Sequence, residues 1–308
     1  MYKTISSGDT IGVISPAWIP VQDRLEKGIK YLQERGYRVK TGKNINKKNG
    51  YFAGKDQERV HDLEEMYRDK EVKCILCSRG GWGGLRMVDK LDYKLIGDNP
   101  KPLVGYSDVT TLQLAIWQQT GQAALSGPMV GVEMGRGIEP FTEEHFWQQI
   151  QNKAPDYYVN YGKWSVTTLS PGNASGVLLG GCLAMVAGLL GTPYCPDYRN
   201  AVLFIEDIGE QPYKIDRYLA QLHQAGIFDQ VSGLILGEFL DCDPGEVENS
   251  FTVDEILQDY FSQAAFPVIA NFPYGHGMKK FTMPVGMMTS FNTETQELSL
   301  ANPFHQYH

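Results

Sequence analysis

The sequence has little that would attach the protein to a nucleic acid or a membrane. Its 28 lysines and arginines are outnumbered by 36 aspartates and glutamates, and the formal net charge is −8. Nucleic acids and anionic membranes bind basic surfaces, so neither is expected as a partner. No run approaches the roughly 18 apolar residues of a membrane-spanning helix, and residues 1–17 lack a signal-peptide pattern. We therefore expect a cytoplasmic protein.

Cysteine is also scarce, and its five residues are an odd number spread along the chain. This pattern favours reduced thiols in the core over disulfide bonds. Cys74 and Cys77 have the spacing of a metal-binding pair, but they lie in the apolar run VKCILC, which predicts a β-strand. Residues three apart on a strand point to opposite faces. We expect two core cysteines and no metal site.

The glycine-rich stretch SRGGWGG, residues 78–84, lacks the features of a nucleotide-binding loop. It has no Lys-Ser/Thr pair and does not match G-x-G-x-x-G, which argues against nucleotide-dependent chemistry such as ligation. Four glycines are more than a strand-to-helix turn needs, so its N–H groups are candidates for binding an oxyanion. Trp82 is a candidate for lining a substrate cleft. Arg79 is either a ligand for a substrate carboxylate or a surface charge.

Alternating strands and helices indicate an α/β fold. With 308 residues, 42% of them apolar, the chain is long enough for two domains or one large α/β unit. Apolar periodicity predicts strands at 9–17, after Gly36 through Val39, and at 72–81, 101–107, 199–207, 231–239 and 267–277. It also predicts a hairpin over 283–302 that turns at residues 292–295. Helices are predicted at 21–36, 56–69, 108–121, 142–151 and 212–226, with a helix and turn at 85–100. This order is typical of a parallel sheet with helices on its faces.

The chain is predicted to form two domains. Residues 136–175 are turn-rich and weakly patterned, and we interpret them as a linker that crosses between the domains. The first domain, residues 1–135, is expected to have a parallel sheet of the flavodoxin or Rossmann kind. The second, residues 176–308, is expected to be a smaller α/β domain with a mixed sheet. Ligands of parallel sheets bind outside the carboxyl ends of the strands, where the glycine-rich stretch and Ser107 both lie.

Ser107 lies at the junction of the strand predicted at 101–107 and the helix predicted at 108–121. A serine here is either a turn or capping residue or a nucleophile. The stretch Gly-Tyr-Ser-Asp lacks the second glycine of the G-x-S-x-G nucleophile pattern. The position nevertheless exposes Oγ and aims the next N–H at the same point, as an acyl-transfer site requires. Ser107 is therefore our candidate nucleophile.

A serine nucleophile needs a base, and His276 is the best candidate among the six histidines. It follows the apolar run PVIANFP and lies between Gly275 and Gly277, which allow a backbone turn that core packing does not require. The other histidines lie on predicted helices or in the last four residues: His61, His145, His223, His305 and His308.

The base is expected to have an orienting carboxylate. Glu206 ends the strand predicted at 199–207, where residues of α/β domains commonly belong to a site. Asp207 and Glu210 are competing candidates. The order Ser, Glu, His along the chain matches one known order of such triads.

Six blocks of the sequence resemble those of the LD-carboxypeptidases, serine peptidase family S66. In chain order they are SRGGWGG, VGYSDVTTL, GVLLGGCLAMVAGLLGTPY, VLFIEDIGEQPYKIDRYLAQL, GLILGEF and FPYGHG. The resemblance spans roughly residues 10–290. The family includes the muropeptide LD-carboxypeptidase A type and the microcin C immunity peptidases.

The resemblance implies a triad of Ser107, Glu206 and His276, with the backbone N–H groups of Gly81 and Asp108 binding the oxyanion. The implied fold has two α/β domains with the active site between them, in a homodimer, with no metal or cofactor. The implied substrate is a small peptide. The enzyme would hydrolyse the bond to the terminal D-alanine of a murein tetrapeptide, whose third residue is diaminopimelate or lysine, in cell-wall recycling.

The sequence departs from the family at Cys182, where relatives commonly have asparagine in a Gly-Gly-Asn-Leu block. The change removes a side chain that both donates and accepts hydrogen bonds. Any support that this asparagine gives must then come from elsewhere.

Two alternative functions remain open. One is a microcin-immunity-type peptidase that cleaves aminoacyl or peptidyl nucleotide analogues. Such relatives usually have a longer loop with aromatic residues before the second domain, whereas the linker here is short but contains Tyr157, Tyr158, Tyr161 and Trp164. The other is a non-catalytic binding protein on the same scaffold, against which the three intact triad positions argue.

Overall fold

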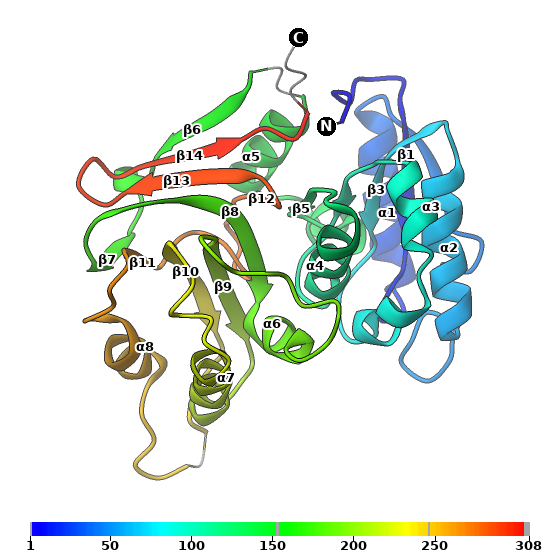
Figure 1. Cartoon of the computed structure of the whole chain (residues 1–308). Coiled ribbons are helices and arrows are strands. Elements are labelled where there is room, and N and C mark those ends of the chain that lie inside the picture. Colours follow the sequence, from blue (N-terminus) through cyan, green and yellow to red (C-terminus); the bar gives the residue numbers. More distant parts are fainter. Residues whose placement is uncertain (1, 152–153, 246, 305–308) are drawn as a thin grey trace.

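The computed structural model describes residues 2–151, 154–245 and 247–304, and its two β-sheets lie side by side (Figure 1). One sheet has six strands and is built mainly from the N-terminal part of the chain, and the other has eight. No helix in this described part is long and apolar enough to cross a membrane.

The first sheet has the strand order of a flavodoxin-like domain. Its strands are β1 (Thr10–Ile14), β2 (Arg38–Thr41), β3 (Val72–Cys77), β4 (Leu103–Val104), β5 (Ala124–Ser126) and β12 (Met283–Val285). The order is β12-β5-β4-β3-β1-β2, and β1 to β5 are parallel to their neighbours, whereas β12 pairs antiparallel with β5. The N-terminal strands therefore follow the order 2-1-3-4-5, with ligands expected at their carboxyl ends. The predicted parallel α/β architecture is confirmed.

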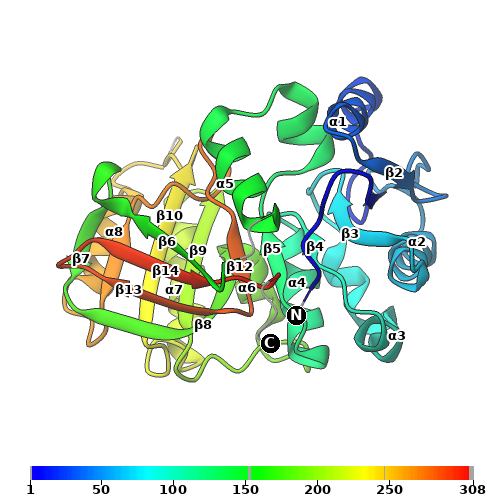
Figure 2. The ribbon, with the colours of Figure 1, turned by 90° about the horizontal axis from the view of Figure 1, so that it is seen from above.

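Helices cover both faces of this sheet, and Figure 2 shows α1 and α3 on opposite sides of its strands. One face packs against α2 (Asp56–Arg68), α3 (Tyr93–Asp98) and α4 (Val109–Thr120), and the other against α1 (Gln22–Glu34), a π-helical turn (Val130–Met134) and α5 (Pro140–Gln151). Along β3, Cys77 points into the first layer and Cys74 into the second. Both thiols are fully buried, so the two are core cysteines, as predicted.

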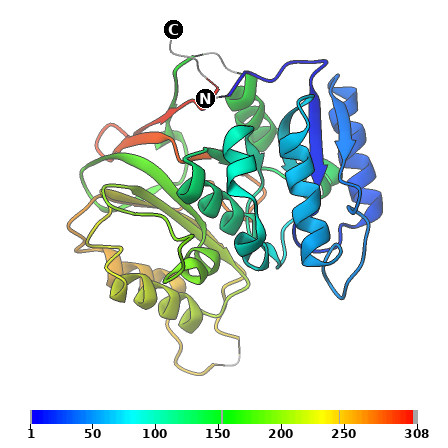
Figure 3. The same cartoon turned by 45° about the vertical axis from the view of Figure 1, so that its right-hand side comes forward.

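The second sheet is mixed. Its order is β6 (Asp156–Asn160), β14 (Glu297–Ala301), β13 (Met288–Asn292), β8 (Asn173–Cys182), β9 (Val202–Ile208), β10 (Gly233–Leu240), β11 (Val268–Ala270) and β7 (Thr167–Ser170). The four strands from β8 to β11 are parallel, and the remaining pairs are antiparallel. The helices of this part are α6 (Leu183–Leu189), α7 (Pro212–Gln224) and α8 (Val253–Phe261). Figure 3 shows α7 and α8, in yellow to orange, side by side below the sheet.

Several predicted elements are shorter in the structure, and for two of them the contacts show why. The strand predicted at 267–277 ends at Ala270, because Asn271 has a φ of 60° and Pro273 has no N–H for a further ladder bond. The chain then forms the loop that carries His276. The helix predicted within 85–100 is confined to α3, where Asp92 caps the start by accepting a hydrogen bond from the N–H of Leu95.

Residues 136–175, which we interpret as a linker, hold α5 and both edge strands of the second sheet, β6 and β7. An edge strand pairs with a neighbour on one side only. The apolar pattern of these two strands is weak, and they were therefore not identified from the sequence. The predicted terminal hairpin is formed by β13 and β14, in which Asn292 pairs with Glu297. The start of the predicted segment instead forms β12 of the first sheet.

Candidate active site

Ser107 follows β4 in a backbone conformation that few serines adopt. Its φ is 63°, and α4 begins two residues later at Val109. A left-handed conformation of a residue other than glycine costs about 1–3 kcal/mol and is often found at active sites. Gly80 lies against this serine: a Cβ at that position would be 2.9 Å from Cβ and 3.0 Å from Oγ of Ser107. The glycine at position 80 therefore allows the loop to approach the hydroxyl.

The Asp108 side chain holds the glycine-rich loop. Its Oδ1 accepts a hydrogen bond from the N–H of Gly83 at 3.1 Å, and its Oδ2 accepts one from Gly84 at 2.7 Å. The carboxyl is 1% exposed, and burial raises its pKa to about 6, although the two N–H donors act in the opposite direction. The sequence indicated a role for the Asp108 backbone but not for this side chain.

Two backbone donors lie free beside Ser107. In the described part of the chain, the N–H groups of Gly81 and Asp108 donate to no acceptor. A Cβ at Gly80, in contact with Ser107, would lie 3.5 Å from the Asp108 nitrogen. Gly81 lines the same cavity as Ser107. Unpaired N–H groups near a hydroxyl are the arrangement that can stabilise an oxyanion.

His276 and Glu206 form a hydrogen-bonded pair. Nδ1 of His276 lies 2.7 Å from Oε2 of Glu206, and Glu206 is completely buried on β9. Gly275 has a φ of 132°, and a Cβ there would lie 2.8 Å from the same carboxylate oxygen. A glycine is thus required both by the turn and by the closeness of Glu206. The pair leaves Nε2 as the ring nitrogen that can accept a proton.

The two competing carboxylates lie elsewhere. Asp207 accepts hydrogen bonds from the N–H groups of Ala184 at 2.9 Å and Ile208 at 2.8 Å, and burial raises its pKa to about 6. The thiol of Cys182 donates weakly to Asp207 at 3.5 Å. Glu210 forms an ion pair with Lys214 at 3.2 Å. Of the three candidates, the structure brings Glu206 to His276.

A buried lysine that the sequence did not single out supports the histidine loop. The Lys280 ammonium donates to the carbonyl of Gly275 and lies 3.5 Å from the carbonyl of Gly277, the two residues that flank His276. Its side chain is 0% exposed. The position of Lys280 four residues after the histidine is visible in the sequence, but its burial is not.

The same ammonium connects the histidine loop to the first sheet. Lys280 Nζ lies 3.5 Å from Oε1 of Glu133 and 3.9 Å from the centre of the Tyr106 ring. The Tyr106 hydroxyl donates to Glu133 at 2.8 Å, and burial raises the pKa of this phenol well above its usual value. The Tyr106 ring meets His276 edge-on, with ring centres 5.0 Å apart. Tyr106 therefore links the nucleophile strand to the histidine.

A cavity of about 230 Å³ brings the candidate residues together. Its lining residues are Val21, Arg24, Arg79, Gly81, Tyr106, Ser107, Met129, Gly131, Val132, Arg136 and His276. Ser107 and Gly81 follow strands of the first sheet, whereas His276 follows a strand of the second, so the cavity lies between the two sheets. Trp82 is half-buried and is not among the lining residues, and Trp18 packs on Gly81 instead.

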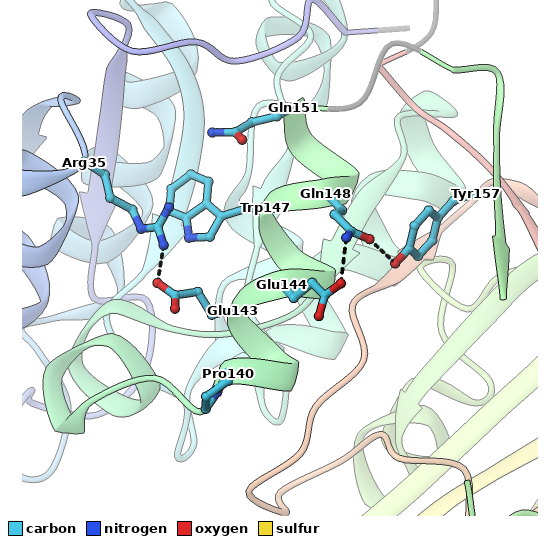
Figure 4. Close-up of a pocket in the computed structure, with 8 residues that line it drawn as sticks. All are labelled: Arg35, Pro140, Glu143, Glu144, Trp147, Gln148, Gln151 and Tyr157. Atoms are coloured by element: carbon cyan, nitrogen blue, oxygen red, sulfur yellow. Dashed lines mark hydrogen bonds and ion pairs between the residues drawn. The ribbon is translucent and has the colours of Figure 1, made fainter. Parts of the chain in front are cut away.

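A larger hollow of about 630 Å³ lies elsewhere, along α5 (Figure 4). Its polar groups are paired with one another: Arg35 with Glu143, Gln148 with Glu144 at 2.9 Å, and the Tyr157 hydroxyl with Gln148 at 2.6 Å. It contains none of the predicted site residues.

The aromatic residues of segment 136–175 are mostly used in packing. Trp164 meets Phe141 and Phe272 edge-on, at 5.2 and 5.4 Å between ring centres. The Tyr161 hydroxyl donates to the carbonyl of Asn292 at 2.8 Å, and the Tyr157 hydroxyl contacts His145 Nδ1 at 2.6 Å. Tyr158, by contrast, is 73% exposed. None of these four lines the cavity around Ser107.

The remaining histidines are away from the cavity. His145 is bonded to Tyr157, His61 is exposed beside Asp62, and His223 lies in the last turn of α7. His305 and His308, in the last four residues, lie outside the described residues.

Comparison with known proteins identifies relatives along the whole chain. Two family models match, described as the LD-carboxypeptidase N-terminal domain over residues 11–127 and the LD-carboxypeptidase C-terminal domain over residues 175–291. A probable murein peptide carboxypeptidase of Bacillus subtilis is 39% identical over 292 residues, covering 94% of this chain and 91% of the relative. The microcin C7 self-immunity protein MccF of Escherichia coli is 27% identical over 331 residues, covering 97% and 95%.

Solved structures agree with this relationship. The crystal structure of a muramoyltetrapeptide carboxypeptidase from Oxalobacter formigenes is similar with a TM-score of 0.83 and 30% identity, covering 94% of this chain and 97% of the other. A structure of MccF in complex with glutamyl sulfamoyl guanosine has a TM-score of 0.90 at 24% identity, covering 99% of both chains, which supports the two-sheet α/β fold.

Proposed function

Because the chain belongs to the LD-carboxypeptidase family, peptidase family S66, and is a serine carboxypeptidase, we propose that Ser107, His276 and Glu206 form its catalytic triad. The observation that carries this proposal is the 2.7 Å hydrogen bond between His276 and a completely buried Glu206, at the cavity that Ser107 also lines. A buried carboxylate bonded to Nδ1 fixes the tautomer of the imidazole and orients Nε2 for the transfer of the serine proton.

The proposed mechanism is acyl transfer. Nε2 of His276 takes the proton of Ser107 Oγ as the oxygen attacks the carbonyl carbon of the scissile bond. The N–H groups of Gly81 and Asp108 bind the oxyanion of the tetrahedral intermediate, and each such donor is typically worth about 3–4 kcal/mol. The carbon–nitrogen bond then breaks as His276 protonates the leaving amine. Water, with His276 as base, hydrolyses the acyl-enzyme and restores Ser107.

The proposed substrate is a murein tetrapeptide, and the leaving group is its terminal D-alanine. The relative in B. subtilis is named a probable murein peptide carboxypeptidase, which supports a peptide of this class. We further propose that the enzyme acts in the cytoplasm on recycled cell-wall fragments, as a homodimer with domains divided near residues 135 and 175. Of the two residues predicted to bind substrate, Arg79 lines the cavity and Trp82 does not.

A microcin-immunity-type activity is the second candidate. The similarity to MccF over 97% of the chain favours it. The packing of Trp164, Tyr157 and Tyr161 weighs against it, because these rings contact their own neighbours and do not line the cavity around Ser107, where a nucleobase would have to stack.

The test is D-alanine release from a defined murein tetrapeptide, measured by mass spectrometry. Wild type is compared with Ser107→Ala and with Ser165→Ala, a control at an exposed serine. Release by wild type and the control, but not by Ser107→Ala, is the expected result. Equal release by Ser107→Ala would refute the nucleophile. Ser107-dependent cleavage of an aminoacyl sulfamoyl nucleotide, without release from the tetrapeptide, would instead support the second candidate.

A further inference from the structure

Three arginines from separate segments converge on the cavity around Ser107. Arg24 lies in the first turn of α1, Arg79 in the loop after β3, and Arg136 just after the π-helical turn. The lining of this cavity includes no aspartate or glutamate. Three guanidinium groups in a lining without a carboxylate favour an anionic ligand.

Among the residues that the structure describes, these guanidinium groups have no acidic partner, unlike most other arginines of the chain. Within residues 2–151, 154–245 and 247–304, the arginines that form ion pairs are Arg35, Arg59, Arg68, Arg86 and Arg199. Arg79 instead donates to the backbone carbonyl of Ile19 at 3.3 Å and lies over the Trp18 ring. Burial and the positive charges of Arg136 and Arg24 lower the pKa of Arg79. The three groups therefore repel one another in the unliganded protein, and a bound anion would relieve that repulsion.

Because the proposed reaction removes a C-terminal residue, the anion in question belongs to the peptide. The cavity of about 230 Å³ is smaller than most ligand pockets, so it fits one or two residues around the scissile bond rather than a whole tetrapeptide. A single carboxylate has about four acceptor positions, whereas three guanidinium groups have about fifteen N–H donors. One carboxylate therefore cannot satisfy the cluster.

Resting on the proposed function, we propose that Arg24, Arg79 and Arg136 form one anion subsite that binds two carboxylates of the substrate. One is the carboxylate of the leaving D-alanine. The other is on the side chain of the residue before it. The subsite then makes the enzyme select a diaminopimelate-type third residue, whose side chain ends in both an ammonium and a carboxylate, over lysine, whose side chain ends in an ammonium alone. A lone cation beside three guanidinium groups is repelled, while a carboxylate can pair with them in a bidentate manner.

The test compares two tetrapeptides that differ at the third residue, diaminopimelate or lysine. We measure kcat/KM for D-alanine release by wild type, by Arg24→Gln, Arg79→Gln and Arg136→Gln, and by the control Arg217→Gln at an exposed position on α7. Wild type and the control should prefer the diaminopimelate peptide at least tenfold. At least one cavity variant should lose about 10- to 100-fold in kcat/KM on that peptide, as expected for a lost hydrogen bond to a charged group, and lose less on the lysine peptide. A variant at an arginine that binds the D-alanine carboxylate should instead lose similarly on both peptides, because both carry that carboxylate.

A binding measurement separates recognition from chemistry. Calorimetry with Ser107→Ala, which keeps the arginines but removes the proposed nucleophile, should show tighter binding of the diaminopimelate peptide, and this difference should shrink in Ser107→Ala/Arg79→Gln. If wild type cleaves both peptides equally, or if all three arginine variants lose activity on both peptides in parallel, the subsite proposal is wrong and the proposed function stands. If wild type releases no D-alanine from either peptide, the proposed function itself fails. Arginine-dependent cleavage confined to an aminoacyl nucleotide would show that the cluster binds phosphate, which also overturns the proposal.

Discussion

Replacement of Lys280 by methionine should both destabilise the fold and lower the turnover rate. The ammonium is completely buried and holds the carbonyls of Gly275 and Gly277, which flank His276. Methionine has a similar length and no charge, so it fills the space while removing every hydrogen bond. The histidine loop would then lose its contact with Glu133 of the π-helical turn that packs against the first sheet.

The size of the effect follows from the contacts. Loss of the charged hydrogen bond to the Gly275 carbonyl costs about 1.5–3 kcal/mol. The Gly277 carbonyl and Glu133 are each 3.5 Å from Nζ, so they contribute less. Glu133 keeps hydrogen bonds from the Tyr106 hydroxyl at 2.8 Å and from the N–H of Met129 at 2.9 Å, so it is not left without a partner. The expected total is a loss of about 2–4 kcal/mol in the free energy of unfolding.

The assay uses Lys279→Met as a matched control, because Lys279 is the exposed neighbour. Urea denaturation gives the free energy of unfolding, and D-alanine release gives kcat and KM. We expect Lys280→Met to lower kcat at least tenfold with a small change in KM, since the loop positions His276 and not the substrate. The control should change stability by less than about 0.5 kcal/mol. The reasoning is refuted if Lys280→Met matches the control in stability and kcat.

Four further predictions concern the residues around the triad. Ser107→Gly should be about 1 kcal/mol more stable than Ser107→Ala in urea denaturation, because glycine adopts the φ of 63° without strain, and equal stability would contradict it. Gly80→Ala should lower kcat at least tenfold, because the added Cβ would lie 2.9 Å from the Cβ of Ser107 and displace the proposed nucleophile. Gly97→Ala is the control and should leave kcat unchanged, because its added Cβ would have no neighbour closer than 3.9 Å. Glu206→Gln should lower kcat about 10²- to 10⁴-fold, because an amide does not stabilise the imidazolium as a carboxylate does. If the variant kept the wild-type kcat, Glu206 would not be a member of the triad. The pKa of Asp207 is about 6 in the folded protein, above its ordinary value of 3.8. The protonated carboxyl therefore stabilises the folded state fully below about pH 4, and this stabilisation is lost as the pH rises through 6. Urea denaturation should therefore show the stability of wild type relative to Asp207→Asn falling by about 3 kcal/mol from pH 4 to pH 7, and a constant difference would contradict the shift.

Local patterns in the sequence were enough to predict much of the fold and the candidate site. Apolar periodicity located most of the strands and helices of the first sheet, because one face of each element is buried whatever its partner. Ser107 and His276 stood out because glycines and strand ends are recognisable without knowledge of distant contacts. The edge strands β6 and β7 were not recognised, because their pairing with β14 and β11 depends on segments far away in the chain.

The sequence by itself determined which residues could take part in acyl transfer, since that depends on side-chain chemistry and on the local backbone around Ser107 and His276. The local pattern left Glu206, Asp207 and Glu210 open, and the family resemblance implied Glu206. The tertiary structure brings Glu206, and not Asp207, to His276, because neighbouring residues on a strand point to opposite sides. It also decided that Lys280 is buried beside Glu133 and that three arginines share one cavity. Burial and convergence of this kind arise from the way two sheets pack against each other, and no local pattern of residues encodes them.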